Sequence, residues 1–259
     1  MTHRSIRTLL FVVAAMAISL SSLFALAAAG KPSSEEAQKM LITGNARFAG
    51  HENTAPLADV ARLKQAATES QGDHAYATIL SCSDSRVPVE QLFDVGVMDV
   101  FVVRVAGNVM KTDEIGSIEY GVVHVRTPLV VVLGHTQCGA VAAVAAELTG
   151  HGHALERNIP PLVAPIVPAV QKVMTEDPSL KGEALVAKAT EENVWEGVRN
   201  LFTQSPAVRD LAAKGEIKVV GAIYDVGTGK VSWLPEGKTG EILKEVQNDP
   251  NRPMNPLAE

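Results

Sequence analysis

Three reactive side chains at alternating positions, Cys82, Asp84 and Arg86, mark the stretch of this sequence best suited to chemistry. They follow the apolar run 75–80, which predicts a buried strand. Side chains alternate along an extended chain, so a thiolate, a carboxylate and a guanidinium would project from the same side. Pro88 cannot donate a ladder hydrogen bond, so the strand should end near it. Open α/β sheets bind ligands at the carboxyl ends of their strands, and we therefore expect a site here.

The only other cysteine of the chain, Cys138, lies in a second polar stretch, 134–139, with the sequence GHTQCG. It follows the apolar run 128–133, which is typical of a strand covered on both faces. Strands of one parallel sheet share a carboxyl edge, so the two polar stretches should meet there. Together with Cys82, His135 and Cys138 would offer two sulfurs and one nitrogen, a set suited to zinc. Three protein ligands leave a fourth tetrahedral position open, as in catalytic zinc sites.

Zinc with an open coordination position lowers the pKa of a bound water and produces hydroxide near neutral pH. Asp84 would accept a hydrogen bond from that hydroxide, and Arg86 would hold Asp84 in place and ionised. The alternative for this pair is an ordinary ion pair that ties a loop, because such pairs are common and contribute little. The alternative for Cys82 and Cys138 is a disulfide.

Strands that alternate with helices predict an α/β fold with a mainly parallel central sheet flanked by helices. Ser33 and Glu36 can form a capping box, which predicts an N-terminal helical arm that ends near Gly50. The turn 225–230 predicts a C-terminal hairpin or edge strand over 231–234. The remaining expected strands are 75–80, 100–105, 128–133 and 217–224. The remaining expected helices are 57–68, 89–93, 111–124, 140–148, 160–174 and 182–202, followed by a loose tail from residue 248.

The composition places limits on the class of protein. The chain has 259 residues, 46% of them hydrophobic, which is enough for one large core, and we expect a single domain over 30–259. The net charge of −6 gives no support for a nucleic-acid partner.

Residues 1–29 resemble a signal peptide, with a basic start, an apolar run over 9–26 and three alanines. We expect cleavage near Ala29, export to the periplasm and no stable membrane association afterwards. An uncleaved membrane anchor is the alternative.

Five motifs together resemble the β-class carbonic anhydrases. They are GNARF at 44–48, CSDSRVP at 82–88, RVAGN at 104–108, GHTQCG at 134–139 and VVGAIYD at 219–225. The resemblance covers nearly all of residues 30–259. It implies reversible hydration of CO₂ to bicarbonate and a proton, by attack of a zinc-bound hydroxide. It also implies one Zn²⁺ per subunit on Cys82, His135 and Cys138, with Asp84 and Arg86 as the catalytic pair.

The resemblance further implies a homodimer or a dimer of dimers, whose N-terminal helices embrace the partner and whose pocket is completed across the interface. Phe101 and Tyr120 match positions that line the pocket in the plant-like subgroup, and we include Gly139 in that pocket. In another subgroup the aspartate closes onto zinc, and a tryptophan three residues before the first ligand serves a regulatory bicarbonate site. Ile79 stands at that position and Ser81 replaces the glycine usual before the cysteine, so we expect an open zinc without that regulatory site.

Two other functions stay open at the level of the sequence. A hydrolase of a CO₂ analogue, carbon disulfide or carbonyl sulfide, would use the same zinc site with different access to the pocket. A non-catalytic zinc or thiol-redox protein would use Cys82 and Cys138 as a switch, although it would not need Asp84 and Arg86. No proton shuttle is assigned to any of the remaining histidines, and Gln71 is the nearest candidate for a pocket glutamine.

Overall fold

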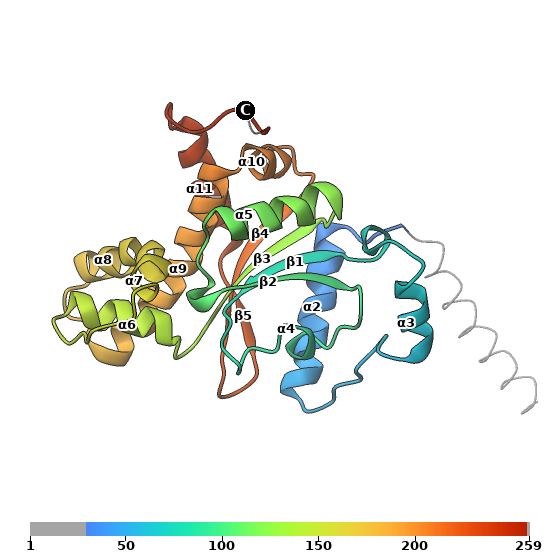
Figure 1. Cartoon of the computed structure of the whole chain (residues 1–259), viewed down its shortest axis with the longest axis horizontal. Coiled ribbons are helices and arrows are strands. Elements are labelled where there is room, and N and C mark those ends of the chain that lie inside the picture. The colour runs from blue at the N-terminus through green and yellow to red at the C-terminus, as the bar shows by residue number, and fades with distance from the viewer. Residues whose placement is uncertain (1–29, 258–259) are drawn as a thin grey trace, which may run out of the picture. The chain divides into compact units, whose positions relative to one another are not determined.

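The core of the structure is a five-stranded sheet with the strand order β2-β1-β3-β4-β5. The computed structural model describes residues 30–257, so the expected signal peptide lies outside the described residues. The first four strands are parallel, and β5 pairs antiparallel with β4 at one edge (Figure 1). This confirms the predicted mainly parallel sheet with a C-terminal edge hairpin. The strands are β1 (Ala77–Ser81), β2 (Val100–Arg104), β3 (Leu129–His135), β4 (Lys218–Tyr224) and β5 (Val231–Trp233).

Most helices lie where the sequence pattern predicts them. The predicted capping box between Ser33 and Glu36 is present at the start of α2. Two helices outside the expected set, α10 and α11, follow α9 and β5. The described helices are α2 (Ser34–Ala49), α3 (Val60–Ala66), α4 (Val89–Leu92), α5 (Thr112–Glu119), α6 (Gly139–Leu148), α7 (Ile159–Val163), α8 (Val167–Glu176), α9 (Gly182–Gln204), α10 (Pro206–Ala213) and α11 (Glu236–Asn248). Short turns of other helix types are η1 (Gln71–Asp73), η2 (Ala106–Asn108), η3 (Tyr120–His124, a π-helix) and η4 (Ala164–Ile166).

Both faces of the sheet are covered, and successive residues of β3 point to opposite faces. Val131 and Leu133 pack with Leu41 of α2 on one face. Val130 and Val132 pack on the other face against side chains of α5, α9 and α11. This burial on both sides explains why β3 appears in the sequence as a continuous apolar run rather than an alternating one.

A third apolar cluster lies beyond the sheet, where α6, α7 and α8 gather against α9 (Figure 1). Cys82 and Cys138 belong to this cluster, together with Val141 and Ile166. The carboxyl ends of β1 and β3 therefore lead into a shielded region rather than directly into solvent. Among residues 30–257, no helix is long and apolar enough to cross a membrane.

Asp94 anchors the N-terminal arm to the segment that follows α4. Its carboxylate accepts hydrogen bonds from Arg47 Nε on α2, from the backbone and hydroxyl of Thr54, and from the Ala55 backbone. The Asp94 side chain is 1% exposed. Burial alone would raise the pKa of Asp94, but the hydrogen bonds from Arg47 and Thr54 outweigh it and lower the pKa to about 2.

Replacing Asp94 by asparagine is expected to lower the free energy of unfolding by about 2–3 kcal/mol, because a buried, charge-assisted network loses its anion. The contribution of Asp94 is complete above the unfolded pKa of about 3.9 and is lost as the pH falls towards the folded value. Urea denaturation at pH 7 and at pH 3 checks both statements. Asp210→Asn, at an exposed position, is the matched control. Equal stability of Asp94→Asn and the parent at pH 7 would contradict the anchoring role.

Candidate metal centre

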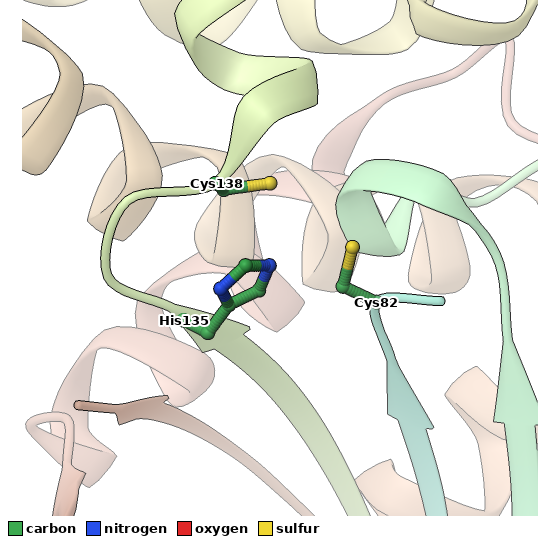
Figure 2. A group of neighbouring side chains, drawn as sticks. All are labelled: Cys82, His135 and Cys138. Atoms are coloured by element: carbon green, nitrogen blue, oxygen red, sulfur yellow. The ribbon is translucent and has the colours of Figure 1, made fainter. Parts of the chain in front are cut away.

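Three buried side chains from two segments of the chain converge at the carboxyl edge of the sheet (Figure 2). Cys82 directly follows β1, His135 is the last residue of β3, and Cys138 caps the N-terminus of α6. The pairing of Ser81 with Leu133 places the ends of β1 and β3 side by side. The two sulfurs and one imidazole nitrogen all lie within 4.8 Å of one another. The structure therefore brings together the residues that the sequence selected as candidate zinc ligands.

His135 is oriented with one ring nitrogen free for a ligand. Its Nδ1 lies 2.9 Å from the main-chain oxygen of Thr136, which fixes Nδ1 as the proton donor. Its Nε2 is buried and has no hydrogen-bond partner among the described residues. A buried nitrogen without a partner is costly, and a metal ion would satisfy it. Donors on tetrahedral zinc are about 3.8 Å apart for two sulfurs, so the group observed here fits zinc after a small contraction.

The surroundings favour the thiolate form of Cys82, whereas Cys138 beside it keeps its proton more strongly. The Gly107 backbone donates a hydrogen bond to Cys82 Sγ at 3.2 Å. The closeness of the two thiols is the largest influence on their acidity: it lowers the pKa of Cys82 and raises that of Cys138. Cys138 also receives backbone hydrogen bonds from the first turn of α6, where the helix dipole favours a negative charge. Both cysteines are free thiols, and the thiolate is the form that binds metal.

Asp84 lies beside this group and is held by Arg86. Arg86 Nε and Nη2 donate to the two carboxylate oxygens of Asp84 at 3.0 and 2.7 Å, and the Arg86 backbone adds a third hydrogen bond at 2.9 Å. The hydrogen bonds from the Arg86 side chain hold the pKa of Asp84 well below its usual range, against the effect of partial burial. Asp84 Oδ2 is 3.9 Å from His135 Nε2. An ionised carboxylate thus stands next to the free nitrogen of the candidate ligand set.

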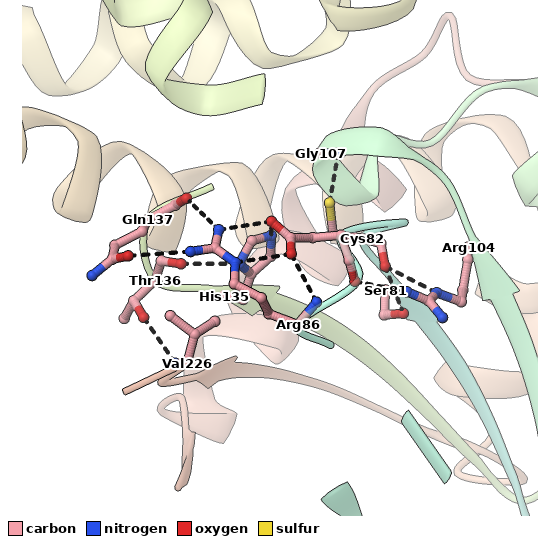
Figure 3. A network of polar contacts seen from close by, with 10 residues as sticks. Ser81, Cys82, Arg86, Arg104, Gly107, His135, Thr136, Gln137 and Val226 are labelled. Atoms are coloured by element: carbon pink, nitrogen blue, oxygen red, sulfur yellow. Dashed lines mark hydrogen bonds and ion pairs between the residues drawn. The ribbon is translucent and has the colours of Figure 1, made fainter. Parts of the chain in front are cut away.

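Two further residues, neither of them among the expected site residues, contact this site (Figure 3). Arg104, the last residue of β2, donates to the main-chain oxygens of Cys82 and Asp84. Gln137 accepts two hydrogen bonds from Arg86. Both residues belong to motifs that carried the family resemblance, RVAGN and GHTQCG. Their contacts depend on which strands are neighbours, and no local pattern in the sequence encodes that.

The three expected pocket residues lie at different places. Gly139 is exposed at the first position of α6, next to Cys138. Phe101 pairs with Thr78, three positions before the end of β1, and its ring lies tilted against that of Tyr120 with centroids 6.0 Å apart. Tyr120 is 50% exposed. Phe101 and Tyr120 therefore contact each other rather than the cysteines of their own chain, and their place in a pocket stays a prediction.

The structure also places Ile79, Ser81 and Gln71, which the sequence suggested as residues that could affect the site. Ile79 and Ser81 are buried in β1. Gln71 begins the short helix before β1, at the amino end of the strand and thus away from the carboxyl edge. This placement speaks against a role for Gln71 beside the metal ligands of its own chain.

Known proteins resemble this chain in sequence and in structure. A family model described as carbonic anhydrase matches residues 77–231. A carbonic anhydrase of Mycolicibacterium smegmatis is 34% identical over 207 residues, which cover 80% of this chain and 96% of that protein. Carbonic anhydrase 2 of Mycobacterium tuberculosis is 34% identical over 210 residues, with 81% and 96% covered. The crystal structure of the β-carbonic anhydrase CafA of Aspergillus fumigatus superposes with a TM-score of 0.61 at 29% identity, with 79% of this chain and 98% of that chain covered.

Proposed function

The chain belongs to the carbonic anhydrase family, in its β class, and we propose that it catalyses the reversible hydration of CO₂ to bicarbonate and a proton. In this proposal Cys82, His135 and Cys138 hold one zinc ion that serves the reaction. The observation that carries the zinc assignment is the convergence of three buried soft donors, one of them a histidine nitrogen with no hydrogen-bond partner among the described residues. A donor set of two sulfurs and one nitrogen suits zinc better than magnesium or calcium, which prefer oxygen.

Bound zinc would act as a Lewis acid that lowers the pKa of a water molecule towards neutrality. The protein supplies the remaining parts of the mechanism. Cys82 and Cys138 would bind as thiolates, and the Thr136 carbonyl keeps the proton of His135 on Nδ1, so that Nε2 is available as a ligand. Burial of all three ligands excludes bulk water and competing anions from their side of the site.

Asp84 is the hydrogen-bond acceptor that orients the attacking oxygen. Its lowered pKa keeps it ionised throughout the neutral range, so it accepts a hydrogen bond rather than donating one. Arg86 occupies both carboxylate oxygens, which supports our proposal that Asp84 stays with Arg86 and leaves a metal position open. Ile79 in the middle of β1 and Ser81 at its end support our proposal that the regulatory bicarbonate site is absent.

Stopped-flow CO₂ hydration by the purified protein tests this function. We expect one zinc per chain by metal analysis, loss of activity after treatment with a chelator, and recovery when zinc is added back. Full activity in protein shown to be free of metal would overturn the proposal. A parallel assay with carbon disulfide separates CO₂ hydration from hydrolysis of a CO₂ analogue, because the same zinc site would serve both reactions.

We also propose a homodimer or a dimer of dimers in which α2 contacts the partner. Met40 and Ile42 on α2 are 45% and 44% exposed, as expected for side chains that a second copy covers. In such an assembly Phe101 and Tyr120 would complete a pocket across the interface.

Export to the periplasm with cleavage near Ala29 is a further proposal. Mass determination of the N-terminus, on protein made in its own host, would test it.

A further inference from the structure

The loop that carries both Cys82 and Asp84 is held on one side by Arg104. Beyond Ser81 this loop leaves the sheet, and two backbone hydrogen bonds with Val105 extend the pairing by a short distance. Arg104 Nε then donates to the Cys82 carbonyl at 3.1 Å, and Nη2 donates to the Asp84 carbonyl at 2.8 Å. The two accepting carbonyls belong to the peptide groups 82–83 and 84–85, so one rigid guanidinium fixes the loop before Ser83 and after Asp84.

The same loop is held on its other side by Gln137. Arg86 Nη1 donates to Gln137 Oε1 at 3.2 Å, and Arg86 Nη2 donates to the Gln137 carbonyl at 3.1 Å. That Nη2 also donates to Asp84 Oδ2, so the guanidinium joins Asp84 to the loop between His135 and Cys138. The Arg86 side chain is 46% exposed, and an exposed arginine with one anchor would readily exchange that contact for water.

The backbone of Gln137 adopts an uncommon conformation at this contact. Gln137 has φ of 57°, in the left-handed region that residues other than glycine rarely adopt. Such a conformation costs about 1–3 kcal/mol and persists where the surroundings determine it. Here it turns the chain between two candidate ligands and places the carbonyl of Gln137 within reach of Arg86.

We propose that Arg104 and Gln137 are positioning residues with separable effects on the same reaction. Arg104 fixes the backbone of Cys82 and thereby slows the loss of zinc. Gln137 fixes Arg86 and thereby the direction of Asp84, so it sets turnover without affecting zinc retention. This inference rests on the proposed zinc-dependent hydration of CO₂.

The first test measures zinc release from the purified protein into excess chelator. Arg104→Met is expected to release zinc about 10-fold faster or more, because groups that support metal ligands contribute about 10–100-fold to metal affinity and a weaker site loses its ion faster. Arg104→Lys should give an intermediate rate, because an ammonium lacks the planar fork that reaches two carbonyls. Arg199→Met is the control, since Arg199 bonds to Glu245 on the remote α11.

The second test compares Gln137→Ala with Gln137→Glu. The alanine variant removes the Oε1 acceptor but leaves the backbone carbonyl and the left-handed φ. We expect its kcat to fall about 10-fold while zinc release stays at the parent rate. Gln137→Glu should recover most of kcat, because a carboxylate oxygen accepts from Arg86 at least as well as an amide oxygen. Gln204→Ala, at an exposed position of α9, is the control.

Three results would overturn the inference. They are parent-like zinc release in Arg104→Met, parent-like kcat in Gln137→Ala, and a Gln137→Glu variant as slow as Gln137→Ala. Thermal unfolding of each variant separates these effects from loss of the fold, and Arg104→Lys keeps the first test decisive if Arg104→Met does not fold. A parent protein that binds no zinc would instead refute the proposed function, and the inference with it.

Discussion

Cys82→Ser is expected to abolish zinc binding and CO₂ hydration together. A serine hydroxyl is a harder and far less acidic group than a thiol, so it replaces a zinc thiolate poorly. It would also leave Cys138 and His135 as two ligands, too few for a stable site. Loss of a group that only supports a ligand costs about 10–100-fold in metal affinity, so loss of a ligand should cost at least about 100-fold.

Metal analysis after dialysis, together with stopped-flow hydration, checks this prediction. Ser83→Ala is the matched control, since it changes the next residue of the same loop, whose side chain is exposed. The control should keep its zinc and its turnover. Zinc bound at full stoichiometry in Cys82→Ser would remove Cys82 from the ligand set, whatever happened to the activity.

Asp84→Asn is expected to retain zinc but lose turnover by about 100-fold or more, the usual scale for a positioned acid–base group. The amide has nearly the shape of the carboxylate, so the fold and the three ligands should survive. It carries no charge, however, and one of its two terminal groups is a donor that faces the donors of Arg86. The remaining oxygen cannot satisfy Arg86 and orient the attacking water as the ionised carboxylate does.

The measurements are zinc content and kcat at neutral pH, where the lowered pKa of Asp84 keeps the parent carboxylate ionised. Asp177→Asn is the control, because Asp177 is exposed and bonds only locally to Ser179. Turnover of Asp84→Asn equal to the parent would exclude Asp84 from the reaction. Loss of zinc in this variant would assign Asp84 a role in metal binding instead.

Comparing these two substitutions also tests whether Cys82 and Asp84, two residues of one short loop, have different roles. Cys82 is 5% exposed and belongs to the apolar cluster formed with α6, α7 and α8, whereas the Asp84 side chain is 19% exposed. Two residues further on, the Arg86 side chain is nearly half exposed. The loop thus runs from a buried end, which suits a metal ion, towards a solvent-exposed end, which suits the exchange of water and protons.

Local signals in the sequence were enough to predict several helices and strands. The apolar run of β3, the capping box of α2 and the edge strand β5 were predicted, because each follows from side-chain periodicity or from contacts three residues apart. The candidate ligands were predicted for the same kind of reason: Cys82 and His135 stand at the ends of apolar strands, and parallel strands share one carboxyl edge. Residue type and position were enough to select them.

The residues that support the site could not be predicted in this way, because their contacts depend on strand order and register. Arg104 reaches the Cys82 carbonyl because β2, rather than β4, is the neighbour of β1 on that side, and strand order is not written in local periodicity. Gln137 meets Arg86 across 51 positions of sequence, a contact that depends on the register of β1 against β3. Asp94 likewise binds the N-terminal arm only once α2 has packed on the sheet. The types and positions of the side chains were thus enough to predict the reactive groups. The contacts that hold those groups in place depend on the packing of strands that are distant in sequence.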